Sequence, residues 1–124
     1  MRVLDHIGIA VADYERSKAF YEQALAPLGY RVAMDMSQYK AVAFGQDEKP
    51  TFWVCEREPY GTGTHVAFAV DDHETVHAFF EAALAAGGTD NGPPGPRPQY
   101  TPTYYAAFVH DFDGNNVEAV CHQG

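Results

Sequence analysis

Two histidines and one glutamate in this sequence are of types that bind divalent metal ions. His6 and His65 each lie in a short apolar run, and Glu118 lies inside the apolar run NVEAVC. A carboxylate among such neighbours is rarely left unpaired. Two imidazoles and one carboxylate suit Fe, Mn, Zn or Ni and leave positions open for water and substrate. The alternative is two core histidines and a glutamate paired with an arginine or tyrosine.

An internal repeat relates the two histidines. When the sequence is shifted by 59 positions, DHIGIAVADYERSKAFYEQALAPLG aligns without gaps on THVAFAVDDHETVHAFFEAALAAGG. His6 then meets His65, Phe20 meets Phe79, and Gly29 meets Gly88. A fixed offset over so long a stretch indicates a duplicated module. A lone histidine in a strand is usually structural, whereas a histidine repeated at the equivalent point of each copy favours a shared functional role.

Each copy has the pattern of a strand, a helix and three further strands. The β-branched runs 3–11 and 65–70 are predicted strands, and the acidic residues at 13 and 71–72 are predicted helix caps. Apolar residues at helical spacing follow each cap, and glycines end each helix. The remaining predicted strands cover residues 30–36, 40–45, 51–56, 88–91, 104–110 and 116–122.

These elements predict an α+β fold of two βαβββ modules whose curled mixed sheets form a cleft. We expect one domain over residues 1–124, with module one at 1–59 and module two at 64–124. Such a chain is long enough to fold around a core without a disulfide.

A proline-rich segment, Asn91 to Thr103, interrupts the symmetry of the repeat. Its five prolines exclude a helix or a central strand. Long connections of this kind are often lids or binding loops, although a surface excursion remains the alternative. The expected ligand contacts are Arg97, Tyr100 and Tyr104 from this region, with Phe52 and Trp53 as an apolar wall. Tyr104 and Tyr105 should point to opposite faces, so at most one of them faces the cleft.

Charge and composition exclude several classes of function. The chain has 17 acidic residues, eight Lys or Arg and a net charge of −9, without the basic cluster that nucleic acid requires. No apolar run approaches the roughly 20 residues of a membrane span, and the first residues do not read as a leader. We therefore expect a cytoplasmic protein that binds neither nucleic acid nor membrane, with Cys55 and Cys121 as small buried hydrophobes.

The ordered motifs resemble the vicinal oxygen chelate superfamily, which includes glyoxalase I, extradiol dioxygenases, bleomycin-binding proteins and fosfomycin-resistance thiol transferases. The resemblance rests on DHIGIAV, SKAFYEQALAPLGY, THVAFAV and HDFDGNNVEAV, and covers nearly the whole chain. It implies that His6, His65 and Glu118 bind one divalent metal ion. It also implies a homodimer, with each cleft formed within one chain or between module one of one chain and module two of its partner.

One departure from the family pattern concerns reaction type. Glyoxalase I has a fourth, acidic ligand on the last strand of module one, where this sequence has Phe52 or Trp53. True glyoxalase I activity is therefore not expected.

The leading hypothesis is a metal-dependent enzyme of the lyase, dioxygenase or transferase type that acts on a small oxygenated molecule. The rival is a metal-free protein that sequesters a small molecule or drug, like the bleomycin-binding members. No catalytic residue beyond the metal ligands is assigned.

Overall fold

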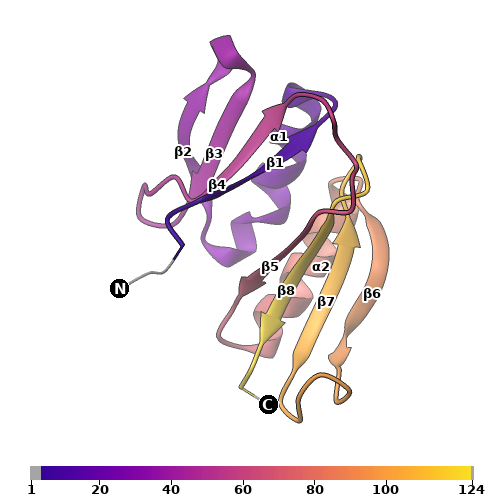
Figure 1. Ribbon diagram of the computed structural model, residues 1–124. Coiled ribbons are helices and arrows are strands. Elements are labelled where there is room, and N and C mark those ends of the chain that lie inside the picture. The colour runs from indigo at the N-terminus through magenta and orange to yellow at the C-terminus, as the bar shows by residue number, and fades with distance from the viewer. Residues whose placement is uncertain (1–3, 124) are drawn as a thin grey trace.

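A computed structural model describes residues 4–123, which form two βαβββ modules (Figure 1). Module one contains β1 (Ile7–Val11), α1 (Tyr14–Ala24), β2 (Arg31–Met36), β3 (Ala41–Gly45) and β4 (Phe52–Glu56). Module two contains β5 (His65–Ala69), α2 (His73–Ala85), β6 (Thr89–Pro96), β7 (Tyr105–His110) and β8 (Asn116–Cys121). Two short 3-10 helices, Ala26–Leu28 and Ser37–Tyr39, flank β2. The predicted first strand began at Val3, which lies outside the described residues.

Each module forms its own four-stranded mixed sheet. The strand orders are β1-β4-β3-β2 and β5-β8-β7-β6. The first strand of each module pairs in parallel with the last, and the other pairs are antiparallel. This topology confirms the predicted α+β fold of paired βαβββ modules.

Both helices begin at the acidic caps that the sequence predicts. The Asp13 carboxylate accepts a hydrogen bond from the Arg16 backbone N–H at 3.1 Å. The Asp72 carboxylate accepts one from the Thr75 N–H at 2.7 Å. These bonds satisfy donors that a helix start leaves unpaired and fix where each helix begins.

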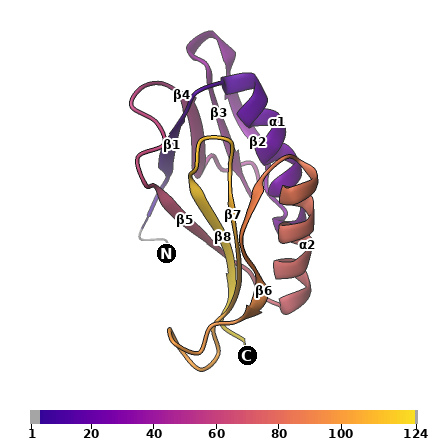
Figure 2. The ribbon, with the colours of Figure 1, turned by 90° about the vertical axis from the view of Figure 1, so that its right-hand side faces the viewer.

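The two helices lie on the same side of the two sheets and contact each other (Figure 2). The apolar side chains between the helices and the sheets form a core shared by both modules, which includes Ile9, Phe52, Phe68 and Phe79. The opposite faces of both sheets carry no helix (Figure 2). We call these the open faces of module one and module two.

A buried aspartate joins the modules at the turn between β7 and β8. Asp111, 4% exposed, accepts hydrogen bonds from the Tyr21 hydroxyl, at 2.6 Å, and from the Asn115 side chain, at 2.8 Å. Its other oxygen accepts the backbone N–H groups of Asp113 and Asn115. Because Tyr21 belongs to α1, this network ties the turn of module two to the helix of module one.

The proline-rich segment is partly a strand, which the sequence did not predict. Pairing of β6 with β7 continues from Thr89 to Pro96, with register shifts around Gly92. β6 is an edge strand, so the missing N–H groups of its prolines cost no ladder bonds on the unpaired side. The prediction that this strand ends at residue 91 was therefore wrong. The segment from Arg97 to Tyr104 connects β6 to β7 and makes two turns of its own.

No helix in residues 4–123 is long and apolar enough to span a membrane.

Candidate metal-binding site

Glu118 lies in the middle of β8 on the open face of module two. Its neighbours in the strand, Val117 and Ala119, point into the shared core, so alternation directs Glu118 to the other side. The side chain is nevertheless 1% exposed, because residues on the open face cover it. One carboxylate oxygen lies 2.9 Å from His65 Nε2, and the other accepts the Tyr104 hydroxyl at 2.5 Å.

His65 opens β5 and presents its ring to the same face. Its Nδ1 lies 3.1 Å from the backbone carbonyl oxygen of Asn116, the residue opposite it in the β5–β8 ladder. A carbonyl oxygen only accepts hydrogen bonds, so Nδ1 carries the proton and donates. Nε2 is then the ring nitrogen that faces a carboxylate oxygen of Glu118. The side chain is 46% exposed, and a ligand can reach it.

His65 Nε2 and the nearer Glu118 oxygen lie 2.9 Å apart, so the contact needs either a shared proton or a metal ion bound by both atoms. A histidine that donates Nδ1–H to a backbone carbonyl is the usual arrangement of a metal ligand, since the bond fixes both tautomer and ring orientation. The donor chemistry of this pair thus fits a divalent ion.

Aromatic side chains surround the pair. The Phe108 ring lies 6.2 Å from the His65 ring in a stacked orientation, and Tyr100 packs edge-on against Tyr104 at 5.0 Å. Burial and the hydrogen bond to Glu118 raise the pKa of Tyr104 to about 12. The Tyr104 hydroxyl thus keeps its proton at neutral pH and remains a donor to Glu118.

Tyr105 points to the opposite face, as the sequence predicts. Its ring stacks on His73 of α2 at 3.7 Å, and its hydroxyl contacts His77 Nε2 at 2.7 Å. Tyr104 is therefore the one of these two tyrosines that borders the candidate site.

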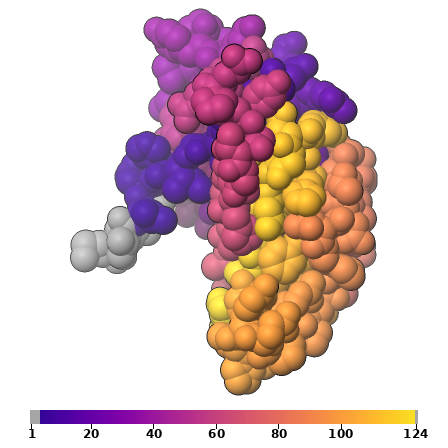
Figure 3. All heavy atoms as spheres, turned by 45° about the vertical axis from the view of Figure 1, so that its right-hand side comes forward, coloured from indigo at the N-terminus to yellow at the C-terminus, as the bar shows by residue number. Residues whose placement is uncertain are grey.

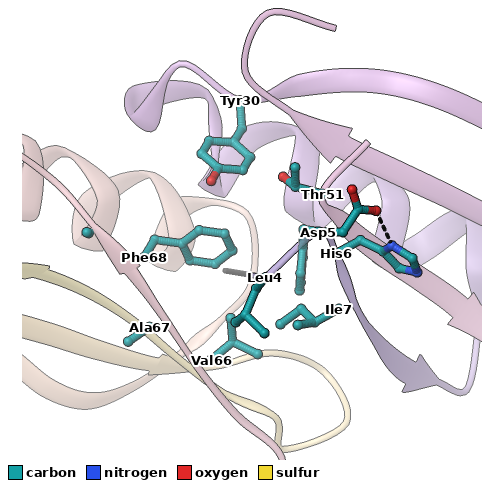
Figure 4. Close-up of a pocket in the computed structure, with 11 residues that line it drawn as sticks. Leu4, Asp5, His6, Ile7, Tyr30, Thr51, Val66, Ala67 and Phe68 are labelled. Atoms are coloured by element: carbon teal, nitrogen blue, oxygen red, sulfur yellow. Dashed lines mark hydrogen bonds and ion pairs between the residues drawn. The ribbon is translucent and has the colours of Figure 1, made fainter. Parts of the chain in front are cut away.

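His6 does not join His65 and Glu118 within one chain. It precedes β1, and its Nδ1 contacts the Asp5 carboxylate at 2.7 Å. Figure 4 shows His6 and Asp5 at the rim of a cavity of about 220 Å³ between the modules, walled by Ile7 and Leu4 and, from module two, by Val66 to Ala69. His65 and Glu118 do not line this cavity. Within residues 4–123, no group of three or more His, Cys, Asp or Glu is placed to hold a metal ion.

The two predicted apolar wall residues lie on opposite faces of β4. Phe52 is 2% exposed and packs in the core against Tyr21 and Phe68. Trp53 is half-buried on the open face of module one, where it lies opposite Gly8 in the β1–β4 ladder. Only Trp53 is thus available to a ligand on the open face.

The strand registers identify the module-one counterpart of Glu118. Glu118 pairs with Ala67 of β5, and Trp53 pairs with Gly8 of β1. Gly8 and Ala67 are equivalent in the repeat, since they differ by the same offset of 59 as His6 and His65. Trp53 therefore stands where the second copy has its glutamate, and module one offers no carboxylate at that position.

Arg97 lies beside the site on the same open face. Its guanidinium carbon lies 5.3 Å from the centre of the Phe108 ring. Sequence reasoning included Arg97 but missed Phe108, although Phe108 lies four residues after Tyr104 and so shares its face of the strand. It also missed the contact of His65 with the Asn116 carbonyl, because every residue type has a backbone carbonyl and the sequence does not show which one is used.

Comparisons with known proteins agree with this architecture. The family model described as "Glyoxalase/Bleomycin resistance protein/Dioxygenase superfamily" matches residues 3–119. A glyoxalase/bleomycin resistance protein from Albidiferax ferrireducens T118 is similar in structure, with a TM-score of 0.83, 28% identity and coverage of 97% of this chain and 99% of that one. The comparison with curated proteins found no significant match.

Two further solved structures show how widely the fold is used. A V278E mutant of glyoxalase I from Zea mays has a TM-score of 0.67 and 28% identity, over 94% of this chain and 45% of that one. TioX from Micromonospora sp. ML1 has a TM-score of 0.73 at 19% identity, over 98% of this chain and 99% of that one, and shares the fold. A duplicated βαβββ chain of this kind is thus of a known class. The chain belongs to the glyoxalase/bleomycin resistance protein/dioxygenase superfamily.

Proposed function

We propose that this protein is a divalent-metal-dependent enzyme that acts on a small oxygenated molecule on the open face of module two. The observation that carries the proposal is the 2.9 Å contact of His65 Nε2 with the buried Glu118 carboxylate. A metal ion bound there would supply a Lewis acid for oxygen atoms of the substrate.

The surrounding residues have definable tasks in such a site. The Asn116 carbonyl orients His65, and the Tyr104 hydroxyl holds the Glu118 carboxylate by a charge-assisted hydrogen bond. Phe108 and Tyr104 exclude water from the buried carboxylate and offer aromatic surface to a substrate. Trp53 at the equivalent position of module one supports a reaction other than that of glyoxalase I, which uses an acid there.

The third predicted ligand, His6, is proposed to come from a second copy of the chain. His6 precedes the first strand of module one, as His65 opens that of module two, and within one chain it lies away from the pair. A symmetric dimer that sets module one of one copy over the open face of module two of the other would bring His6 to the pair twice.

Metal binding tests the proposal directly. Equilibrium dialysis against Mn, Fe, Ni and Zn should give one ion per chain for the wild type and none for His65→Ala. The matched control is His77→Ala, which removes a histidine from α2 and should leave binding unchanged. Failure of all four ions to bind the wild type would contradict the proposal.

Mixing two variants tests the shared site. Neither His6→Ala nor His65→Ala should bind metal tightly, but co-refolding them in equal amounts should restore about a quarter of the sites, since half the dimers then carry one intact site. If both histidines served the same ion from one chain, every site would contain a lesion and mixing would restore nothing.

The second candidate function is metal-free binding of a small molecule or drug. It is favoured by the fact that both Glu118 oxygens already have partners within the chain, so the carboxylate does not need a metal ion to be paired. The net charge of −9 would suit a cationic ligand. Tight binding of a cationic glycopeptide that is unaffected by chelation would support this candidate over the enzyme.

A further inference from the structure

Module two contains a single permanent positive charge. Of the eight Lys and Arg residues in the sequence, Arg97 alone falls between residues 64 and 124, whereas eight acids fall there. In such an acidic module, an arginine would be expected to pair with a carboxylate. In the described part of the chain, however, no acid lies within ion-pair distance of Arg97.

The guanidinium of Arg97 is instead held by its own loop. Nη1 donates to the carbonyl oxygens of Gly95, at 2.8 Å, and Pro96, at 3.4 Å, and Nη2 donates to that of Pro93 at 2.7 Å. These neutral acceptors fix the side chain but do not cancel its charge. Three bonds also leave two of the five N–H groups of an arginine without a partner in residues 4–123.

Gly92 makes room for this arrangement. A Cβ atom at Gly92 would lie 3.0 Å from the Phe108 ring and 3.2 Å from Arg97 Nη2, and the backbone has a φ of +148°. A larger residue there would displace the arginine from the aromatic ring. The rigid proline backbone around it keeps the guanidinium over Phe108 at little entropic cost.

The position of Arg97 relative to the metal-binding pair follows from the sheet. His65, Glu118, Phe108 and Gly92 lie on successive strands in the order β5, β8, β7 and β6. The Phe108 ring lies 6.2 Å from the His65 ring and 5.3 Å from the guanidinium carbon of Arg97, so one aromatic ring separates the arginine from the pair. Figure 3 shows β5 and β8 side by side on this surface, with the segment around residues 97–104 at its lower end.

We infer that Arg97 binds the acidic group of the substrate, and that the substrate is an elongated anion with metal-binding oxygens at one end and a carboxylate near the other. The inference rests on the proposed function, since it places both ends on the open face of module two. The half-buried aromatic ring of Phe108 between them suits a flat or apolar middle. Without this arginine, an anion would be repelled by a protein of net charge −9.

Matched pairs of acids and amides test the inference. Benzoate and benzamide, mandelate and mandelamide, and succinate and succinamide are titrated into ¹⁵N-labelled protein, with shifts followed at residues 97, 104 and 108. At least one acid should bind about tenfold more tightly than its amide, which is the effect of one charge-assisted hydrogen bond. Arg97→Gln should abolish that preference, and Arg97→Lys should retain part of it. The control Arg31→Gln, on the exposed β2, should leave it unchanged.

Three results would overturn the inference: no acid shifts these residues, acids and amides bind equally, or the preference survives in Arg97→Gln. Zinc affinity is measured on the same samples to separate this failure from that of the proposed function. Zinc binding by the wild type and by Arg97→Gln without any acid preference would refute the role of Arg97 alone. An acid preference without zinc binding would refute the metal site and leave the role of Arg97 in place.

Discussion

The two modules share one fold but have different chemistry on their open faces. In module two, the first-strand histidine meets a buried glutamate on the neighbouring strand, and a tyrosine and a backbone carbonyl orient the pair. In module one, the equivalent histidine pairs with an adjacent aspartate, and the position of the glutamate holds Trp53. Duplication thus supplied two histidines at equivalent points, and only the second copy has a carboxylate partner on its last strand.

The two modules therefore differ at the candidate site in their side chains, although their strands are arranged in the same way. The β1–β4 and β5–β8 ladders have equivalent registers, and one clear difference between them is Trp53 in place of Glu118. Substitutions at these two positions should therefore separate fold from function.

The largest expected effect is on metal affinity at these two equivalent positions. Glu118→Ala removes a proposed ligand and should weaken divalent-ion binding by more than about 100-fold, since loss of an outer partner alone costs about 10–100-fold. Trp53→Ala removes a large side chain from the matching position and should change affinity little. Calorimetric titration with Zn and Mn measures both affinities. An equal loss of affinity in the two variants would contradict the proposed difference between the modules.

The turns before the last strands should differ in stability. Asp111→Ala would leave the Tyr21 hydroxyl, which is fully buried, without its acceptor and should cost about 3 kcal/mol. In module one, Gln46 anchors the corresponding turn through one bond to the Leu28 carbonyl, and Gln46→Ala should cost less than about 1 kcal/mol. Urea unfolding compares the two, and similar costs would show that the Asp111 network does not hold the modules together.

Adding a carboxylate to module one tests whether that module approaches the proposed ion. Trp53→Glu places an acid at the counterpart of Glu118, and we expect the affinity for divalent ions to rise about tenfold if His6 and position 53 reach the shared ion. The same change in a His6→Ala background should give a smaller gain. Dialysis against Ni and Zn measures both variants, and an unchanged affinity would indicate that module one does not approach the ion.

The smallest effect concerns the pH dependence of stability. Since the pKa of Tyr104 rises from 10.0 to about 12 on folding, its contribution is fully present below pH 10 and is lost as the pH rises toward 12. Tyr104→Phe should therefore lose stability less steeply than the wild type over this range. Tyr14 and Tyr21 also have raised pKa values, so unfolding curves of the two proteins are compared as a difference. Exposed Tyr39→Phe is the control, and parallel curves for Tyr104→Phe and the wild type would contradict this assignment.

Much of the fold could be predicted because the signals are local. The repeat, the caps Asp13 and Asp72, and the alternation that buries Val117 and Ala119 are all visible in the sequence, and the structure confirms the elements they predict. The extension of β6 through Pro96 could not be predicted, because prolines disfavour strands except at an edge, and the sequence does not show which strand is the edge.

The candidate site was harder to predict than the fold. Alternation directs His65 and Glu118 to one face, but the repeat shows only that His6 and His65 are equivalent, not that they meet. His6 and His65 lie at equivalent points of two modules that sit side by side, so they are apart within one chain. Only a second copy of the chain would bring a His6 close to His65. The metal set of His6, His65 and Glu118 therefore stays a prediction, and the contacts of Arg97 and Phe108 depend on register shifts that no residue pattern reveals.

The most direct test of the central claim is to locate a bound ion by paramagnetic broadening. Substoichiometric Mn²⁺ is added to ¹⁵N-labelled protein, and the loss of backbone signals is followed by residue. We expect the signals of His65 and residues 116–118 to disappear first, together with that of His6 if a second copy supplies it. Broadening that instead centres on His73 and His77 of α2, or on scattered surface acids with no loss at His65 and Glu118, would contradict a metal site on the open face of module two.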